Sequence, residues 1–194
     1  AAKPELVLDL CAGAGGKTLA LAAMLPPESK IIAADTDRGR LSRIEPRKRR
    51  ASARNIETIL LAPGNEMEAL GHLKASCDLV LIDAPCSGTG TWRRNPELRW
   101  RMTPKRLDHT TELQQRLMEL GSEMVKPGGR LVYAVCSLLD AEGGDQTDRF
   151  LENHPQWQEI SIDLPVGRPY RKGALLSPHH DGTDGFYFTC LEKL

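Results

Sequence analysis

The stretch "LVLDLCAGAGGKTLALAAML" (residues 6–25) decides the fold, because its hydrophobic pattern changes in the middle. The apolar run at 6–10 predicts a buried strand, and the segment 16–25 predicts a helix. The small residues between them predict a tight turn that presents backbone N–H groups at the start of the helix. A strand, a glycine-rich turn and a helix in this order are typical of an open α/β sheet with a ligand at its edge.

The same alternation continues along the chain. Further apolar runs lie at 30–35, 57–62, 77–84 and 128–137, and helix-like segments lie at 38–54, 66–75 and 103–126. This order predicts an α/β fold, with a mostly parallel sheet covered by helices on both faces. The segments 157–164 and 185–194 predict two more strands that pair antiparallel at the sheet edge, which gives seven strands in all.

Length and composition suit one domain, 1–194, because 194 residues with 40% hydrophobic side chains form a single core. The sequence has no run of 18 apolar residues and no secretory signal, so we expect a cytoplasmic protein without a membrane partner. The first strand opens the chain abruptly and without a methionine, which is typical of a piece of a longer protein.

The five cysteines contain no Cys-x-x-Cys pair, so free thiols are expected rather than a disulfide framework or a zinc site. The cysteines are Cys11, Cys77, Cys86, Cys136 and Cys190. His179, His180 and Asp181 are adjacent in the sequence and predict a surface turn rather than metal ligands. We therefore expect no metal.

Net charge does not indicate a partner, because lysine and arginine total 26, as do aspartate and glutamate. The distribution of charge is more informative. Segment 38–54 holds eight basic residues against Glu45 alone, and segment 91–106 interleaves arginines with Trp92 and Trp100. These segments are either solvated surfaces or surfaces for phosphates and unstacked bases.

The tripeptide Gly16-Lys17-Thr18 invites a nucleoside-triphosphate interpretation. That loop requires glycine five residues before Gly16, where this chain has Cys11, so the motif fails. A dinucleotide or S-adenosylmethionine remains as the ligand of the turn. Asp35 ends the second predicted strand about 20 residues further on, where a carboxylate accepts hydrogen bonds from ribose hydroxyls. The alternative is that Asp35 only caps the following helix.

Two cysteines follow predicted strands. Cys86 lies in "DAPCSGTG" (83–90) and Cys136 begins "CS" (136–137). The carboxyl ends of strands in an open α/β sheet form the rim on which ligands lie, so both thiols and Asp83 are expected at one crevice. The alternative for each cysteine is a small buried side chain.

At this point the sequence resembles a known family, the RNA cytosine-5 methyltransferases of the Sun/Fmu type. The resemblance extends over nearly the whole chain, through "LDLCAGAGGKT", "DAPCSGTG", "RRNPELRW", "LVYAVCS" and "DGTDGFYF". It implies a Rossmann-like, class I S-adenosylmethionine-dependent methyltransferase fold. It also implies a catalytic domain that follows an N-terminal RNA-binding region in a longer protein.

The resemblance implies a role for each catalytic residue. Cytosine C5 is a poor nucleophile, so a thiolate first adds to C6. In the family this thiolate corresponds to Cys136, and Cys86 assists proton removal or release of the product. Asp83 would bind the cytosine edge at N3 and N4, and Lys17 would reach towards the base. A cation near the nucleophile, such as Lys17, would lower the thiol pKa.

The implied cofactor is S-adenosylmethionine. Its expected contacts are Cys11, Ala12, Gly13, Ala14, Gly15, Gly16, Lys17, Asp35, Arg40, Asn65 and Asp83. Two of these depart from the family pattern: Ala14 replaces a proline, which removes a fixed φ, and Asn65 replaces an aspartate, which removes a charge.

The expected function is methylation of cytosine C5 in RNA, with ribosomal RNA as the partner, transfer RNA as a second candidate, and a monomeric enzyme. Three alternatives stay open. A DNA cytosine-5 methyltransferase would use Cys86 as its nucleophile, a degenerate module would bind RNA without catalysis, and a nicotinamide-dependent oxidoreductase would leave the two thiols unexplained.

Overall fold

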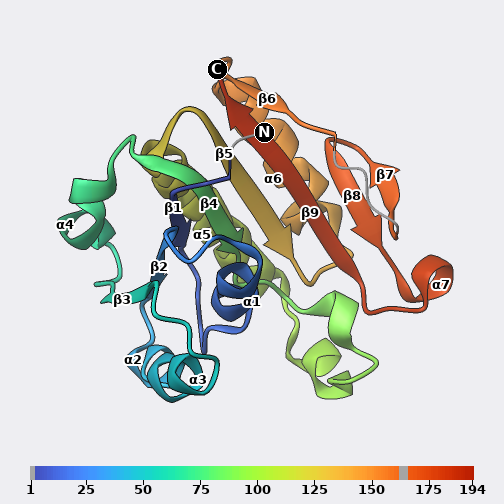
Figure 1. The fold of residues 1–194 in the computed structure, drawn as a ribbon. Helices are drawn as coiled ribbons and strands as arrows, with labels where there is room; N and C mark the ends of the chain where they lie inside the picture. Colours follow the sequence, from blue (N-terminus) through green and yellow to red (C-terminus); the bar gives the residue numbers. More distant parts are fainter. Residues whose placement is uncertain (1–2, 162–165) are drawn as a thin grey trace. The chain divides into compact units, whose positions relative to one another are not determined.

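The computed structural model describes residues 3–161 and 166–194 (Figure 1). The chain divides into two compact units. The first unit contains the chain up to Asp83 together with Leu120–Leu131. The second contains Ala84–Glu119 and Val132–Leu194. Helix α5 (Pro104–Met124) and strand β5 (Val125–Val135) pass through both, close to the helix and the strand predicted at 103–126 and 128–137.

The first unit is built on parallel strands in the order β3-β2-β1-β4. Their bounds are β1 (Leu6–Asp9), β2 (Lys30–Asp35), β3 (Ile56–Leu60) and β4 (Cys77–Asp83). In the register of the central strand, Leu8 lies opposite Ile32 of β2 and Val80 of β4. All three side chains are completely buried, as expected for parallel strands that are covered on both faces. The predicted parallel strands are therefore confirmed.

The helices of the first unit follow these strands. They are α1 (Gly16–Met24), α2 (Arg38–Leu41), α3 (Ile44–Arg50), α4 (Glu66–Leu70) and the short 3-10 helix η1 (Gly71–Leu73). The arginine-rich segment forms two helices, because Pro46 lies in the first turn of α3, where its missing N–H has no intrahelical partner. Leu41 and Ile44 pack in the same core cluster as Val7 and Ile31, which anchors both short helices.

The second unit is antiparallel. Strand β9 (Phe186–Lys193) pairs with β6 (Trp157–Glu159) and with β8 (Gly173–Leu176), and β8 pairs with β7 (Arg168–Tyr170). Its helices are α6 (Gly144–Asn153), α7 (Pro178–Asp181) and the 3-10 helices η2 (Thr89–Thr91), η3 (Pro96–Arg101) and η4 (Asp140–Glu142). The expected antiparallel pairing of the two C-terminal strands is confirmed by the β6–β9 register.

The number of strands differs from the prediction, because the described residues form nine strands rather than seven. The additional β7 and β8 are short. They are hard to recognise in the sequence because they contain Pro169 and Gly173, and proline and glycine are unfavourable in strands. Of the strand expected at 157–164, only Trp157–Glu159 is extended in the sheet, and 162–164 lie outside the described residues. Within the described ranges, no helix is both long and apolar enough to cross a membrane.

Gly90 connects the segments that contain Cys136 and Gly185 through two backbone hydrogen bonds. Its N–H donates to the Cys136 carbonyl at 3.1 Å, and its own carbonyl accepts from the Gly185 N–H at 2.8 Å. A Cβ added to Gly90 would lie 2.0 Å from the Gly185 carbonyl oxygen, so a side chain here must displace the backbone.

We expect Gly90→Ala to lower the free energy of unfolding by about 1–3 kcal/mol, because the backbone must move to admit the methyl group. Urea denaturation followed by circular dichroism measures the change. Gly71→Ala is the control, since a Cβ there meets nothing within 4 Å. Equal stability of the two variants would contradict the packing described at Gly90.

Candidate active site

The turn after β1 adopts a conformation that glycine favours. Gly13 has φ +55° and Gly15 has φ +80°, and the Gly15 N–H donates to the Ala12 carbonyl at 2.8 Å. Helix α1 then begins at Gly16 with no acidic residue in its first turn, and no described side chain caps it. This end of α1 therefore suits an anionic or strongly polar ligand group.

Asp35 lies beside this turn, as the sequence predicts. One carboxylate oxygen accepts from the Gly13 N–H at 2.7 Å, and the other accepts from the Asp37 N–H at 2.7 Å. The cap of α2 is the side chain of Asp37, which accepts from the Arg40 N–H at 2.9 Å. Asp35 is therefore not the helix cap, and each of its oxygens retains a lone pair for a ligand hydroxyl.

Lys17 and Asp83 form an ion pair. Lys17 comes from the first turn of α1 and Asp83 from the end of β4, and both side chains remain partly exposed, at 43% and 33%. Two residues that the sequence assigns to catalysis are thus joined at one edge of the first unit. The remaining expected contacts of this unit, Arg40 and Asn65, are exposed: Arg40 lies 3.7 Å from the Asp37 carboxylate, and the Asn65 amide donates to Glu68 at 2.6 Å.

Asp9 is a buried carboxylate directly below the turn. The Thr18 hydroxyl donates to one of its oxygens at 2.6 Å, and the other oxygen has no hydrogen-bond partner among the described residues. Burial raises the pKa of Asp9 to about 6 despite the Thr18 hydrogen bond. Burial also raises the pKa of the nearby Cys11 thiol, and the Asp9 charge adds to this effect. The sequence analysis did not select Asp9, although a charged residue in an apolar strand is a recognisable signal.

Helix α3 supports the turn from outside. The Arg47 guanidinium donates to the Ala14 carbonyl at 2.6 Å, and Ile44 packs so closely that a Cβ on Gly15 would lie 2.8 Å from its Cγ1. The sequence analysis missed this role of Arg47, because one arginine among eight basic residues carries no distinguishing signal.

In the second unit, the two predicted thiols lie against each other. The Cys86 and Cys136 Sγ atoms are 3.3 Å apart, within hydrogen-bond distance for sulfur, and both side chains are half-buried. The hydrogen bond to Cys136, followed by burial, raises the pKa of Cys86 well above its usual range. The contact with Cys136 therefore disfavours a thiolate at Cys86. A nearby buried carboxylate, Glu142, accepts from the Ser87 N–H at 2.7 Å, and this residue was also missed from the sequence.

The tryptophan-containing segment keeps an exposed aromatic ring. Trp100 is 77% exposed, and the Arg99 guanidinium lies 4.3 Å from its ring centroid. Arg93 and Arg94 are instead paired with Asp184. On the first unit, the exposed side chains of Arg38, Arg43 and Arg50 project from α2 and α3 or the turn between them. Both basic segments thus lie on the surface of their units.

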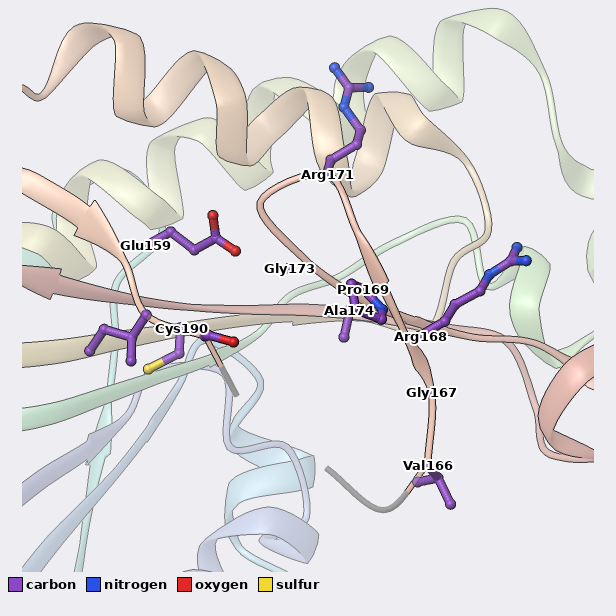
Figure 2. A pocket seen from close by; sticks show the side chains of 11 residues that line it. Glu159, Val166, Gly167, Arg168, Pro169, Arg171, Gly173, Ala174 and Cys190 are labelled. Atoms are coloured by element: carbon purple, nitrogen blue, oxygen red, sulfur yellow. The ribbon is translucent and has the colours of Figure 1, made fainter. Parts of the chain in front are cut away.

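A cavity of about 410 Å³ lies in the second unit, beside the β7–β8 hairpin (Figure 2). Glu159, Arg168 and Cys190 are among its lining residues, and Arg171 at the hairpin turn forms ion pairs with Asp145 and Asp148 of α6. None of the site residues expected from the sequence lines this cavity. Over the described ranges, no group of three or more His, Cys, Asp or Glu side chains is arranged to hold a metal ion.

Comparison with known proteins places these features in a family. The family described as 16S rRNA methyltransferase RsmB/F matches residues 1–192. The ribosomal RNA small subunit methyltransferase B of Vibrio cholerae is 33% identical over 97% of this chain, and that of Thermus thermophilus is 34% identical over 98%. The chain spans only 42% and 45% of those two relatives, respectively.

Solved structures show the same fold. A methyltransferase homolog protein from Pyrococcus horikoshii has a TM-score of 0.82 and 30% identity, over 99% of this chain and 62% of its own. NSun6 from Pyrococcus horikoshii, solved with SFG, has a TM-score of 0.85 and 26% identity, over 97% of this chain and 47% of its own. The predicted Rossmann-like methyltransferase fold, a mixed sheet with helices on both faces, is thereby confirmed.

The raised pKa of Asp9 predicts a pH-dependent stability. The folded state binds the Asp9 proton more tightly than the unfolded chain does. The proton's contribution to the free energy of unfolding is therefore complete below the ordinary pKa of 3.8 and is lost as pH rises through about 6. Ionisation should therefore cost the native protein up to about 3 kcal/mol between pH 4 and 7.5.

Asp9→Asn should lose less stability than the native protein over this range, because it has no proton to release. Urea denaturation at several pH values measures the difference. The exposed Asp108→Asn serves as the control. Parallel curves for the native protein and Asp9→Asn would show that Asp9 does not titrate in this window.

Loss of the Arg47 hydrogen bond should loosen the glycine turn. In Arg47→Ala we expect faster amide hydrogen exchange at residues 12–16 and a loss of about 1 kcal/mol in the free energy of unfolding. Arg50→Ala removes an exposed arginine from the same helix and is the matched control. The same exchange rates in both variants would contradict a supporting role for Arg47.

Proposed function

Because the chain belongs to the RsmB/F family of 16S rRNA methyltransferases, we propose that it forms the catalytic domain of an enzyme that methylates cytosine C5 in RNA. The observation that carries this proposal is the contact between the Cys86 and Cys136 thiols, whose Sγ atoms are 3.3 Å apart. Addition of a thiolate to cytosine C6 needs one activated cysteine, and its release needs a nearby proton. A pair of thiols meets both requirements.

The proposed cofactor is S-adenosylmethionine, which supplies the electrophilic methyl group when bound. The uncapped N-terminus of α1 suits its carboxylate, and the carboxylate of Asp35 suits its ribose hydroxyls. The relative solved with SFG, an analogue of S-adenosylmethionine, supports this choice. Ala14 has the backbone N–H that a proline would lack, so the turn keeps its donors, and the Asn65 side-chain oxygen can accept a hydrogen bond where the family has an aspartate.

The proposed mechanism assigns a step to each residue. The Cys136 thiolate forms a bond to cytosine C6, and the displaced π electrons make C5 nucleophilic. Asp83 holds the N3 and N4 edge of the base, and its partner Lys17 holds that carboxylate. After methylation, water takes the C5 proton, the electrons of the C5–H bond re-form the C5–C6 double bond, and the C6–sulfur bond breaks with its electron pair on Cys136. The Cys86 thiol then donates its proton to the departing Cys136 thiolate.

The raised pKa of Cys86 supports this division of roles. A protonated thiol is a proton donor and a weak nucleophile. The DNA-type alternative would need Cys86 to attack the base as a thiolate, which its raised pKa opposes. A Lys17 contribution to activating Cys136 remains part of the proposal, and a pH–rate profile that is unchanged in Lys17→Ala would contradict it.

The proposed substrate is ribosomal RNA in the cytoplasm, the RNA that the named bacterial relatives act on. The exposed Trp100 with Arg99 suits an unstacked base, and the arginines of α2 and α3 suit phosphates. Because the chain spans less than half of these relatives, selection of one cytosine is assigned to the longer protein.

We expect Cys136→Ala to reduce methyl transfer by at least about a thousandfold, because the nucleophile is removed. Cys86→Ala should instead accumulate a covalent RNA–protein adduct that survives denaturing electrophoresis. Both variants are assayed in the longer protein, with labelled S-adenosylmethionine and either small-subunit RNA or DNA.

Full activity of Cys136→Ala would refute the assignment of the nucleophile. Transfer to DNA that depends on Cys86 would favour the alternative enzyme. If calorimetry shows no binding of S-adenosylmethionine to the native protein, the degenerate RNA-binding module is the better description.

A further inference from the structure

Glu142 is a completely buried carboxylate at the end of η4, six residues after Cys136. No described lysine or arginine forms an ion pair with it. Its carboxylate is instead held by hydrogen-bond donors from other segments of the second unit. A buried charge without a counter-ion is costly, so the groups around it indicate what the charge acts on.

The carboxylate holds both residues that flank Cys86. Its Oε1 accepts from the Ser87 N–H at 2.7 Å, and its Oε2 accepts from the Ser87 hydroxyl. The Gln114 side-chain amide donates to Oε1 at 3.3 Å and to the Pro85 carbonyl at 2.9 Å. Ser87 is thus fixed directly and Pro85 through Gln114, which leaves the Cys86 backbone little freedom.

The same network fixes the loop of Cys136. The Ser137 hydroxyl lies 3.4 Å from the Ser87 hydroxyl and 3.0 Å from that of Thr89. The Tyr133 hydroxyl donates to the Glu142 carbonyl at 2.6 Å, which ties η4 back to strand β5. The two cysteine-bearing loops are therefore joined through Glu142 and the hydroxyls around it.

The charge of Glu142 also acts on the thiols. The ionisable groups that act on Cys86 are Cys136, from the end of β5, and Glu142, from η4, whereas the Gly88 N–H favours the thiolate. A nearby carboxylate disfavours a second negative charge, so Glu142 opposes ionisation of Cys86. The Glu142 charge therefore acts in the same direction as the contact with Cys136, because both raise the pKa of Cys86.

We propose that Glu142 is a positioning residue, which aligns Cys86 with Cys136 through Ser87 and Gln114 and whose negative charge opposes ionisation of the Cys86 thiol. This inference rests on the proposed function, because it concerns the thiol that releases the product. It adds a residue outside the cysteine motifs to the machinery of the site.

Glu142→Gln tests the charge, because glutamine keeps an acceptor for the Ser87 N–H and removes the negative charge. Alkylation by iodoacetamide is followed at several pH values, and mass spectrometry of peptides resolves Cys86 from the other cysteines. We expect the alkylation midpoint of Cys86 to fall by about one pH unit, equivalent to a tenfold rise in its thiolate fraction. Asp140→Asn removes an exposed charge from the same short helix and should leave the midpoint unchanged.

Ser87→Ala tests the positioning separately, because it removes one donor to Glu142 and leaves the charge in place. We expect slower release of methylated RNA from the covalent adduct, by about tenfold for one lost charge-assisted hydrogen bond, with the Cys86 midpoint unchanged. Thermal unfolding of each variant verifies that it is folded.

An unchanged Cys86 midpoint in folded Glu142→Gln overturns the role of the charge, and an unchanged release rate in Ser87→Ala overturns the positioning. If Glu142→Gln does not fold, Glu142→Asp replaces it: it keeps the charge but shortens the side chain, so slower release with a retained midpoint is expected and unchanged release refutes the proposal. Failure of the proposed function differs from all of these outcomes, because the native protein itself would then form no adduct with RNA.

Discussion

The glycine turn after β1 is the constraint on which the first unit depends. Gly15 has φ +80° and no room for a side chain beneath Ile44, while Gly13 donates to Asp35. Because β1 lies between β2 and β4, the residues that follow these parallel strands meet at one edge. The turn, Asp35 and the Lys17–Asp83 pair are therefore gathered there by topology and held by a few short hydrogen bonds.

The main feature of the second unit is a pair of cysteine side chains in contact with each other. Cys86 and Cys136 are in contact, yet the hydrogen bond, burial and the Glu142 charge all favour a proton on Cys86. A protonated Cys86 suits a reaction in which it supplies a proton after the other thiol has attacked. Gly90 contributes to the same arrangement, because it binds the Cys136 carbonyl and admits Gly185 at close range.

Ala14 in the glycine turn connects the family comparison with the local hydrogen bonds. The curated relatives from Vibrio cholerae and Thermus thermophilus are ribosomal RNA methyltransferases by name. The resemblance seen in the sequence implies a proline at the position of Ala14, whose ring would fix φ. Arg47 donates to the carbonyl of that same residue at 2.6 Å. A side-chain hydrogen bond thus restrains the turn at the position where a proline ring would have restrained it.

The sequence by itself determined the parallel strands, the glycine turn and the residues of the two cysteine motifs, because hydrophobic period and short motifs are local properties. It also indicated Asp35. It missed Asp9, Arg47 and Glu142, and it missed the short strands β7 and β8. Only the tertiary structure decided these features. The burial of Asp9 and Glu142 and the hydrogen bond from Arg47 to the Ala14 carbonyl arise only when segments that are far apart in the chain pack together.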